Sequence, residues 1–126
     1  MNADVELLLI PWLISTLNVR AVTDLPENLA DVLPLVQVTR IGGPDNDDNP
    51  RFDTPTVDID CFGVDRGAAS GLAGRVHAAL RVTLPGLQVA GATVTQVLTV
   101  TGPSWRPYDN TELRRFSSTY RLFVKS

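Results

Sequence analysis

With 126 residues and a net charge of −3, the chain is expected to form one domain and to lack the basic surface that grips nucleic-acid phosphates. Its single cysteine, Cys61, excludes an internal disulfide and indicates a reducing compartment. The apolar run over residues 5–14 is shorter than the roughly 20 residues of a membrane span, so a soluble cytoplasmic chain is expected.

Helices are predicted at two places in the chain. Apolar residues recur at i, i+3, i+4 and i+7 over residues 2–17, where Asn2 or Asp4 can cap the first turn. Pro11 lies inside this helix and removes one hydrogen bond, so a kink or a later start is expected. The second helix is predicted over residues 65–82.

Strands are predicted where β-branched residues cluster or alternate with polar ones, at residues 35–41, 56–63, 88–101 and 116–124. Segments 18–34 and 102–112 contain prolines. The first is expected to be a short extended piece followed by a loop, and the second is expected to be a loop. The order α-β-β-α-β-β predicts an α+β fold of one domain over residues 1–126. It is a two-layer sandwich in which a mainly antiparallel four-stranded sheet carries the helices on one face.

A long polar loop separates the first two predicted strands. Residues 42–55 are rich in Gly, Pro, Asn and Asp, and the middle of the loop has too little apolar surface to offset the entropy of ordering it. Its acidic residues begin like a calcium loop, but the Gly and the final Glu of an EF-hand are missing. We predict a flexible loop that becomes ordered on a partner. The expected partner-contact residues are Asp45, Asp47, Asp48, Arg51 and Phe52.

Cys61 and His77 form the one possible nucleophile–base pair in the sequence. Alternation places Cys61 on an apolar strand face, which is typical of a small core residue, and a lone helix histidine is usually structural. One Cys and one His do not make a zinc site, and the glycine-rich segment 63–75 lacks the signature of a phosphate-binding loop. No metal or cofactor is therefore expected.

Asp58 and Asp60 share one face of a predicted strand, with their Cα atoms about 7 Å apart. This spacing is within reach of a glycosidase acid–base pair, which leaves a small hydrolase as an alternative function. Few aromatic residues are available to line a sugar cleft. The polar face of a sheet, or an acidic surface in an assembly, is favoured over catalysis, and no enzymatic activity is expected.

The second predicted helix has two unlike faces. The stripe expected to dock on the sheet consists of Ala69, Leu72, Ala73, Val76 and Leu80. The opposite face consists of Gly67, Gly71, Gly74 and Ala78, flanked by Arg75, His77 and Arg81. Each interior glycine costs about 1 kcal/mol of helix propensity relative to alanine. The glycines therefore indicate close approach of another backbone, unless Gly67 and Gly71 lie in a frayed first turn.

Three short segments together resemble one protein family. They are "VTRIGG" before the long loop, "DIDCFGVDR" at the entry to the second helix, and "GPSWRP" before the last strand. Over nearly the whole chain the sequence resembles the tail-terminator, or tail-completion, proteins of long-tailed phages, in the form seen in phages of actinobacteria. Head-to-tail connector and head-closure proteins, which are similar in size and architecture, are the alternative.

The resemblance implies structural work at the head–tail junction of a virion. Members of the family form a hexameric ring that caps the tail tube, ends its polymerisation and joins the tail to the head connector. The implied partners are further copies of the chain, the major tail tube protein and the connector, while DNA passes through without specific binding and no membrane is involved. The expected subunit interface is Gly67, Gly71, Gly74, Arg75 and Ala78, and the expected acidic surface is Asp58 and Asp60.

Overall fold

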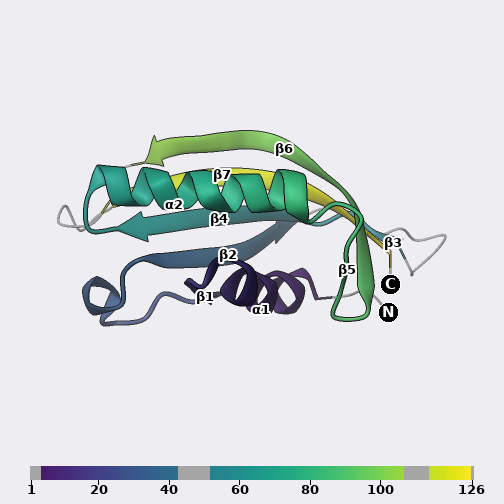
Figure 1. Cartoon of the computed structure of the whole chain (residues 1–126), viewed down its shortest axis with the longest axis horizontal. Coiled ribbons are helices and arrows are strands. Elements are labelled where there is room, and N and C mark those ends of the chain that lie inside the picture. Colours follow the sequence, from purple (N-terminus) through teal and green to yellow (C-terminus); the bar gives the residue numbers. More distant parts are fainter. Residues whose placement is uncertain (1–3, 43–51, 107–113, 126) are drawn as a thin grey trace.

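The computed structural model describes residues 4–42, 52–106 and 114–125, which form one curved sheet with two helices side by side on one face (Figure 1). The helices are α1 (Val5–Leu17) and α2 (Arg66–Ala78), and α2 continues into a π-helical turn, η2 (Ala79–Thr83). The strands are β1 (Arg20–Val22), β2 (Leu35–Gly42), β3 (Phe52–Asp53), β4 (Thr56–Gly63), β5 (Gln88–Val89), β6 (Ala92–Arg106) and β7 (Arg114–Lys125).

The α+β class is confirmed, but the prediction of a four-stranded sheet is wrong. The sheet has the order β1-β2-β4-β7-β6-β5, and β3 pairs with β7 beside this path. β2, β4 and β7 lie at the predicted places, whereas the strand predicted over residues 88–101 is divided by the turn at Ala90 and Gly91 into β5 and β6. β1 lies in the segment expected to contain a short extended piece, and β3, with two residues, is too short to show a period of two. β1 runs parallel to β2, which makes the sheet mixed.

The first helix begins at Val5 because Asp4 caps it. The Asp4 carboxylate accepts hydrogen bonds from the backbone N–H groups of Glu6 and Leu7, at 3.0 and 3.2 Å. The helix runs through Pro11, and this residue lies on the exposed side of the helix. The predicted Asp4 cap is therefore confirmed, and Pro11 does not end the helix.

The core lies between the helices and alternate residues of the central strands. Val57 and Ile59 of β4 pair with Tyr120 and Ser118 of β7, and all four side chains are buried. In the strand predicted over residues 116–124, Tyr120, Leu122 and Val124 thus share the core face. Burying each large aliphatic side chain contributes roughly 1.5–3 kcal/mol, so this layer holds the helices on the sheet.

The opposite face of the sheet is covered at one end, which the sandwich prediction missed. Phe62 lies on the same face as Asp58 and Asp60, but it is fully buried. It packs with Leu35 and with Leu29 of a 3₁₀ turn, η1 (Leu29–Asp31), in the connection from β1 to β2. A second small core therefore lies on the face away from α1 and α2.

The C-terminal hairpin is longer than predicted. β6 extends through Trp105 into the segment expected to be a loop, with irregular pairing between Thr99 and Ser104. Trp105 pairs with Phe116 of β7 and lies beneath the Arg66 guanidinium, 5.1 Å from the ring centre. β5 turns into β6 at Ala90 and Gly91, both with positive φ, a two-residue hairpin turn.

Candidate subunit interface

The orientation of α2 is set by its cap and its buried stripe. The Asp65 carboxylate accepts a hydrogen bond from the Ala68 N–H at 2.7 Å, and the helix begins at Arg66. The predicted stripe, whose last member Leu80 lies in η2, is buried against the sheet. Because this stripe faces inward, the small residues on the opposite side of α2 face outward.

The outward side, which we call the glycine face, consists of Gly67, Gly71, Gly74 and Ala78. All four residues are exposed. A Cβ atom built at Gly71 or Gly74 would meet no atom within 4 Å, whereas a Cβ at Gly63, just before the helix, would lie 2.6 Å from the Ala69 nitrogen. The fold of one subunit therefore explains Gly63 and leaves Gly71 and Gly74 unexplained. Gly71 lies in the second turn of α2, so the frayed-first-turn alternative applies only to Gly67, the second residue of the helix.

An apolar groove runs along one flank of the glycine face. It has a volume of about 380 Å³ and lies between α2 and the Leu33–Pro34 segment, with Val64 at its edge. The Val64 side chain is 65% exposed although it is apolar. The glycine face and this groove together make a surface that a further chain could cover without displacing any side chain.

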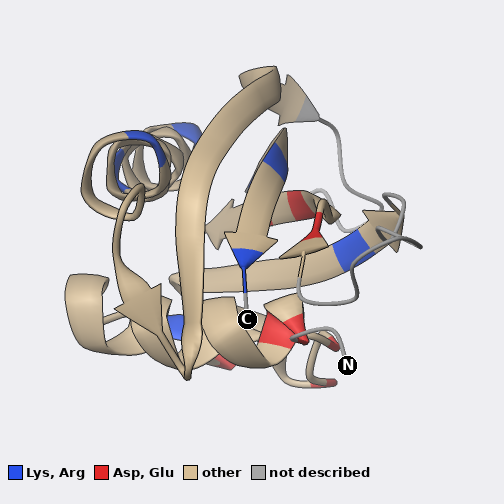
Figure 2. Cartoon of the chain, turned by 90° about the vertical axis from the view of Figure 1, so that its right-hand side faces the viewer, with Lys and Arg blue, Asp and Glu red and all other residues tan. Residues whose placement is uncertain are grey.

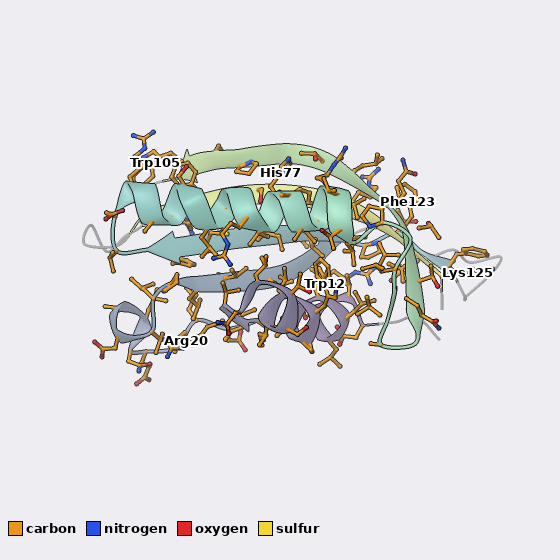
Figure 3. The ribbon with its side chains drawn as sticks, in the orientation of Figure 1. Trp12, Arg20, His77, Trp105, Phe123 and Lys125 are labelled. Carbon is orange, nitrogen blue, oxygen red and sulfur yellow. The ribbon has the colours of Figure 1, made fainter. Side chains whose placement is uncertain are left out.

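The basic residues that flank the glycine face all make contacts within the subunit. Arg75 donates to the Leu17 carbonyl at 2.7 Å and so ties α2 to the end of α1. Arg81 donates to the Val97 carbonyl at 3.1 Å and to Thr99 Oγ1 at 3.0 Å. His77, on the side of α2 toward β7, lies with its Nδ1 atom 2.7 Å from the Tyr120 hydroxyl (Figure 3). These side chains are held in place on either side of the glycines.

Asp58 and Asp60 join β4 to β7 on the face away from the helices. Asp58 accepts a hydrogen bond from Thr119 Oγ1 at 2.6 Å, and Asp60 accepts one from the Ser117 hydroxyl. Both carboxylates are half-buried. Cross-strand acceptors of this kind stabilise a sheet, and the donors are hydroxyl groups rather than a base that could share a catalytic proton.

The family model of the phage tail termination proteins matches residues 1–126, the whole chain. The chain belongs to this family. A chain in the virion of a native gene transfer agent particle shares the fold, with a TM-score of 0.62 and 13% sequence identity over 90% of this chain and 84% of that chain. No curated protein matches the sequence.

Membership confirms the family that the sequence segments resembled. A phage tail termination protein is a structural virion protein and a non-enzymatic kind of protein. In this tail termination protein Cys61 is 1% exposed, and burial, with the nearby Asp60 carboxylate, raises the pKa of its thiol to about 12. A neutral, buried thiol is not a nucleophile at physiological pH, so Cys61 is a core residue.

Among residues 4–42, 52–106 and 114–125 of the tail termination protein, no three His, Cys, Asp or Glu side chains lie close enough to hold a metal ion. Within the same ranges, no helix has the length and apolar character needed to cross a membrane.

The predicted partner-contact loop is only partly within the described structure. Asp45, Asp47, Asp48 and Arg51 lie outside the described residues. Phe52, expected to be a loop anchor, belongs to β3 and pairs with Lys125 of β7. The Lys125 ammonium lies over the Phe52 ring, 5.8 Å from the ring centre. The prediction of a loop throughout residues 42–55 is therefore wrong at its C-terminal end, because pairing with β7 orders that end.

Sequence reasoning missed the residue that organises the base of the loop, Arg40. Its guanidinium binds both carboxylate oxygens of Asp53 and, through Nε, the Gly42 carbonyl at 3.2 Å. Its backbone N–H donates to Glu6 of α1 at 3.0 Å. The sequence signal for Arg40 is its charge near the end of an otherwise uncharged strand. Its partner Asp53 lies in the segment predicted to be a loop.

Proposed function

We propose that this tail termination protein forms a homo-hexameric ring that caps the tail tube, ends its polymerisation and joins the tail to the head connector. The observation that carries the proposal is the glycine face. Gly71 and Gly74 lie in the interior of an exposed helix, where each costs about 1 kcal/mol relative to alanine, and nothing in the subunit requires them. Close approach of a neighbouring subunit to the α2 backbone explains why glycine occupies these two positions.

The charge of the subunit suits a ring through which DNA passes. The net charge is −3, and Asp58 and Asp60 add two half-buried carboxylates to the face of the sheet away from the helices. Anionic surfaces repel phosphates, so DNA at the head–tail junction would move past the ring without being bound. The Asp58 and Asp60 surface serves in this proposal as a contact or electrostatic surface.

Substitutions on the glycine face test the ring. Gly71→Leu and Gly74→Leu place a large side chain where a neighbour would approach, while the open space around both positions leaves the fold intact. We expect the wild-type protein to show rings by electron microscopy and light-scattering masses far above the 13.7 kDa of one chain. The leucine variants should remain monomeric at the same concentration. Gly71→Ala is the matched control, since it changes helix propensity with little added bulk.

Normal capping of tails by both leucine variants would contradict the use of the glycine face. Circular dichroism and unfolding curves accompany the assay, so loss of rings through misfolding is separated from loss of the contact.

We further propose that residues 43–51 contact the tube protein or the connector. The support is the way the base of the segment is built: Arg40 bonds to Gly42 before it and to Asp53 after it. Replacing 43–51 by a short Gly-containing turn retains this base and should leave the stability unchanged. Tail joining by the shortened protein is the readout, and full joining would rule out a role for the segment.

A further inference from the structure

The outer side of α1 is apolar and uncovered in the subunit. Leu7, Pro11 and Ile14 follow one another at i, i+4 and i+7, which places them in one line opposite the buried side of the helix. Leu7 is 69% exposed, Ile14 is 44% exposed, and Pro11 is exposed between them. We call these three residues the α1 ridge. A helix that is apolar on both its inner and its outer side is typically covered on both.

Two grooves lie beside the α1 ridge. A groove of about 390 Å³ lies between Leu7 and Pro11 on one side and Leu87 and Ala90 on the other. A second groove, of about 330 Å³, lies between Ile14 and the segment that contains Val22 and Pro26. The α1 ridge and the two grooves therefore form one uncovered surface, in which Arg20 is the charged residue that lines a groove.

The charges around this surface and around the glycine face have opposite signs. Near α1 and the β1–β2 connection the exposed acidic residues are Asp4, Asp24, Glu27 and Asp31, with Arg20 as the one base among residues 4–39. Residues 66–105 contain no acidic residue, and their exposed bases are Arg66, Arg75 and Arg81. In Figure 2, α2 carries blue bands, while red bands lie near the start of α1.

The arginines beside the glycine face contact neutral groups within the described structure. Arg66 lies over the Trp105 ring, Arg75 bonds to a carbonyl, and Arg81 bonds to a carbonyl and a hydroxyl. Among residues 4–42, 52–106 and 114–125, these three guanidinium groups have no carboxylate partner. Their charges remain available to an acidic surface outside the subunit.

We propose that the α1 ridge of one copy packs against the glycine face of α2 in the next copy. The inference rests on the proposed ring. It states which surface of the neighbouring copy covers the α1 ridge and which covers the glycine face. A ridge of large apolar side chains fits a helix face without side chains, and the acidic residues around the ridge meet the arginines around the glycines. The contact joins two different patches of one chain, so it is heterologous, the kind of contact that can close into a ring.

Cross-linking between singly substituted copies tests this pairing. Purified Ile14→Cys and Gly71→Cys proteins, carrying tags of different size, are mixed and treated with a short bifunctional maleimide. We expect cross-linked dimers that contain one chain of each kind, at least about tenfold more abundant than dimers of either variant alone. Leu98→Cys, an exposed leucine of β6 with a similar exposed fraction of 39%, replaces Ile14→Cys as the matched control and should give no product with Gly71→Cys. Wild-type protein has only the buried Cys61 and should not react.

Self-association is measured on the same samples, which separates the two proposals. Leu7→Ser with Ile14→Ser should weaken association at least about tenfold, and raising the salt concentration should weaken that of the wild type. Rings without mixed Ile14–Gly71 products, or with mainly Gly71–Gly71 products, would overturn the pairing and leave the ring standing. A protein that stays monomeric and gives no cross-link at any concentration would overturn both.

Discussion

Arg40 of β2 holds Asp53 of β3 through two hydrogen bonds, from Nη1 to Oδ2 at 2.8 Å and from Nη2 to Oδ1 at 3.1 Å. The Asp53 side chain is 3% exposed and that of Arg40 is 28% exposed. Asp53 also accepts a hydrogen bond from the Thr54 N–H at 2.9 Å. The pair closes the base of the long loop and keeps β3 against β7.

Removing one partner of this ion pair should destabilise the protein. Asp53→Asn leaves the Arg40 charge beside a neutral amide, and we expect the free energy of unfolding in urea to fall by about 2 kcal/mol. Arg40→Met should cost a similar amount, because it leaves the Asp53 carboxylate buried without its guanidinium. The double variant should lose clearly less than the sum of the two single losses. Strict additivity would show that the two side chains do not stabilise each other.

The glycines around α2 should respond to alanine in opposite directions. Gly71→Ala and Gly74→Ala should each raise the stability of the isolated subunit by about 0.5–1 kcal/mol, because the added Cβ enters open space in a helix interior. Gly63→Ala should lower it by more than 1 kcal/mol, because its Cβ would meet the Ala69 backbone at 2.6 Å. Thermal unfolding of the three variants side by side checks the contrast. Destabilisation by Gly71→Ala in a monomer would show that this glycine serves the subunit fold.

The buried thiol should make stability depend on alkaline pH. An exposed cysteine ionises near pH 8.5, whereas burial raises the pKa of Cys61 to about 12. Between these values the unfolded chain releases a proton that the folded chain keeps, so stability is fully present below about pH 8.5 and falls as pH rises. From pH 7.5 to 9.5 the loss attributable to Cys61 should be about 1.4 kcal/mol. In urea unfolding over this pH range, the Cys61→Ala variant should lose less free energy of unfolding than the wild type, by that amount. An equal dependence of the free energy of unfolding on pH in the two proteins would contradict the raised pKa of Cys61.

The Tyr120 hydroxyl should contribute modestly through its contact with His77. Tyr120→Phe keeps the ring in the core and removes only the group that lies 2.7 Å from His77 Nδ1. We expect a loss of about 1 kcal/mol in the free energy of unfolding, because one partly buried hydrogen bond is removed. His77→Ala and the double variant complete the cycle, and a coupling energy near zero would mean that the contact does not stabilise the fold.

Asn substitutions at Asp58 and Asp60 should leave both fold and stability nearly unchanged. An amide oxygen can still accept the hydrogen bonds from Thr119 and Ser117, so each substitution should cost less than about 1 kcal/mol. The double variant, assayed for hydrolysis of glycans beside the wild type, also tests the catalytic alternative. A hydrolytic activity present in the wild type and lost in the variant would assign these carboxylates to catalysis.

Several features of this protein follow from residues close together in the chain. The Asp65 cap, the buried stripe of α2 and its glycine face depend on spacing within one helix, and the alternation of Val57, Ile59 and Cys61 depends on spacing within one strand. Helix and strand periods are local, so a sequence displays them directly. The family resemblance was likewise carried by short segments.

Other features were decided only by the tertiary structure. β1, β3 and β5 exist because a longer neighbouring strand offers them hydrogen bonds, and two or three residues show no pattern of their own. In the sequence, Asp53 looks like one more acidic loop residue. The structure shows that it binds Arg40, which lies thirteen positions earlier in the chain. In the sequence, Phe62 looks like a half-exposed strand residue. In the structure, Leu29 covers it on the face of the sheet away from α1 and α2. These contacts join residues that are distant along the chain, and they form only when the whole sheet brings their strands together.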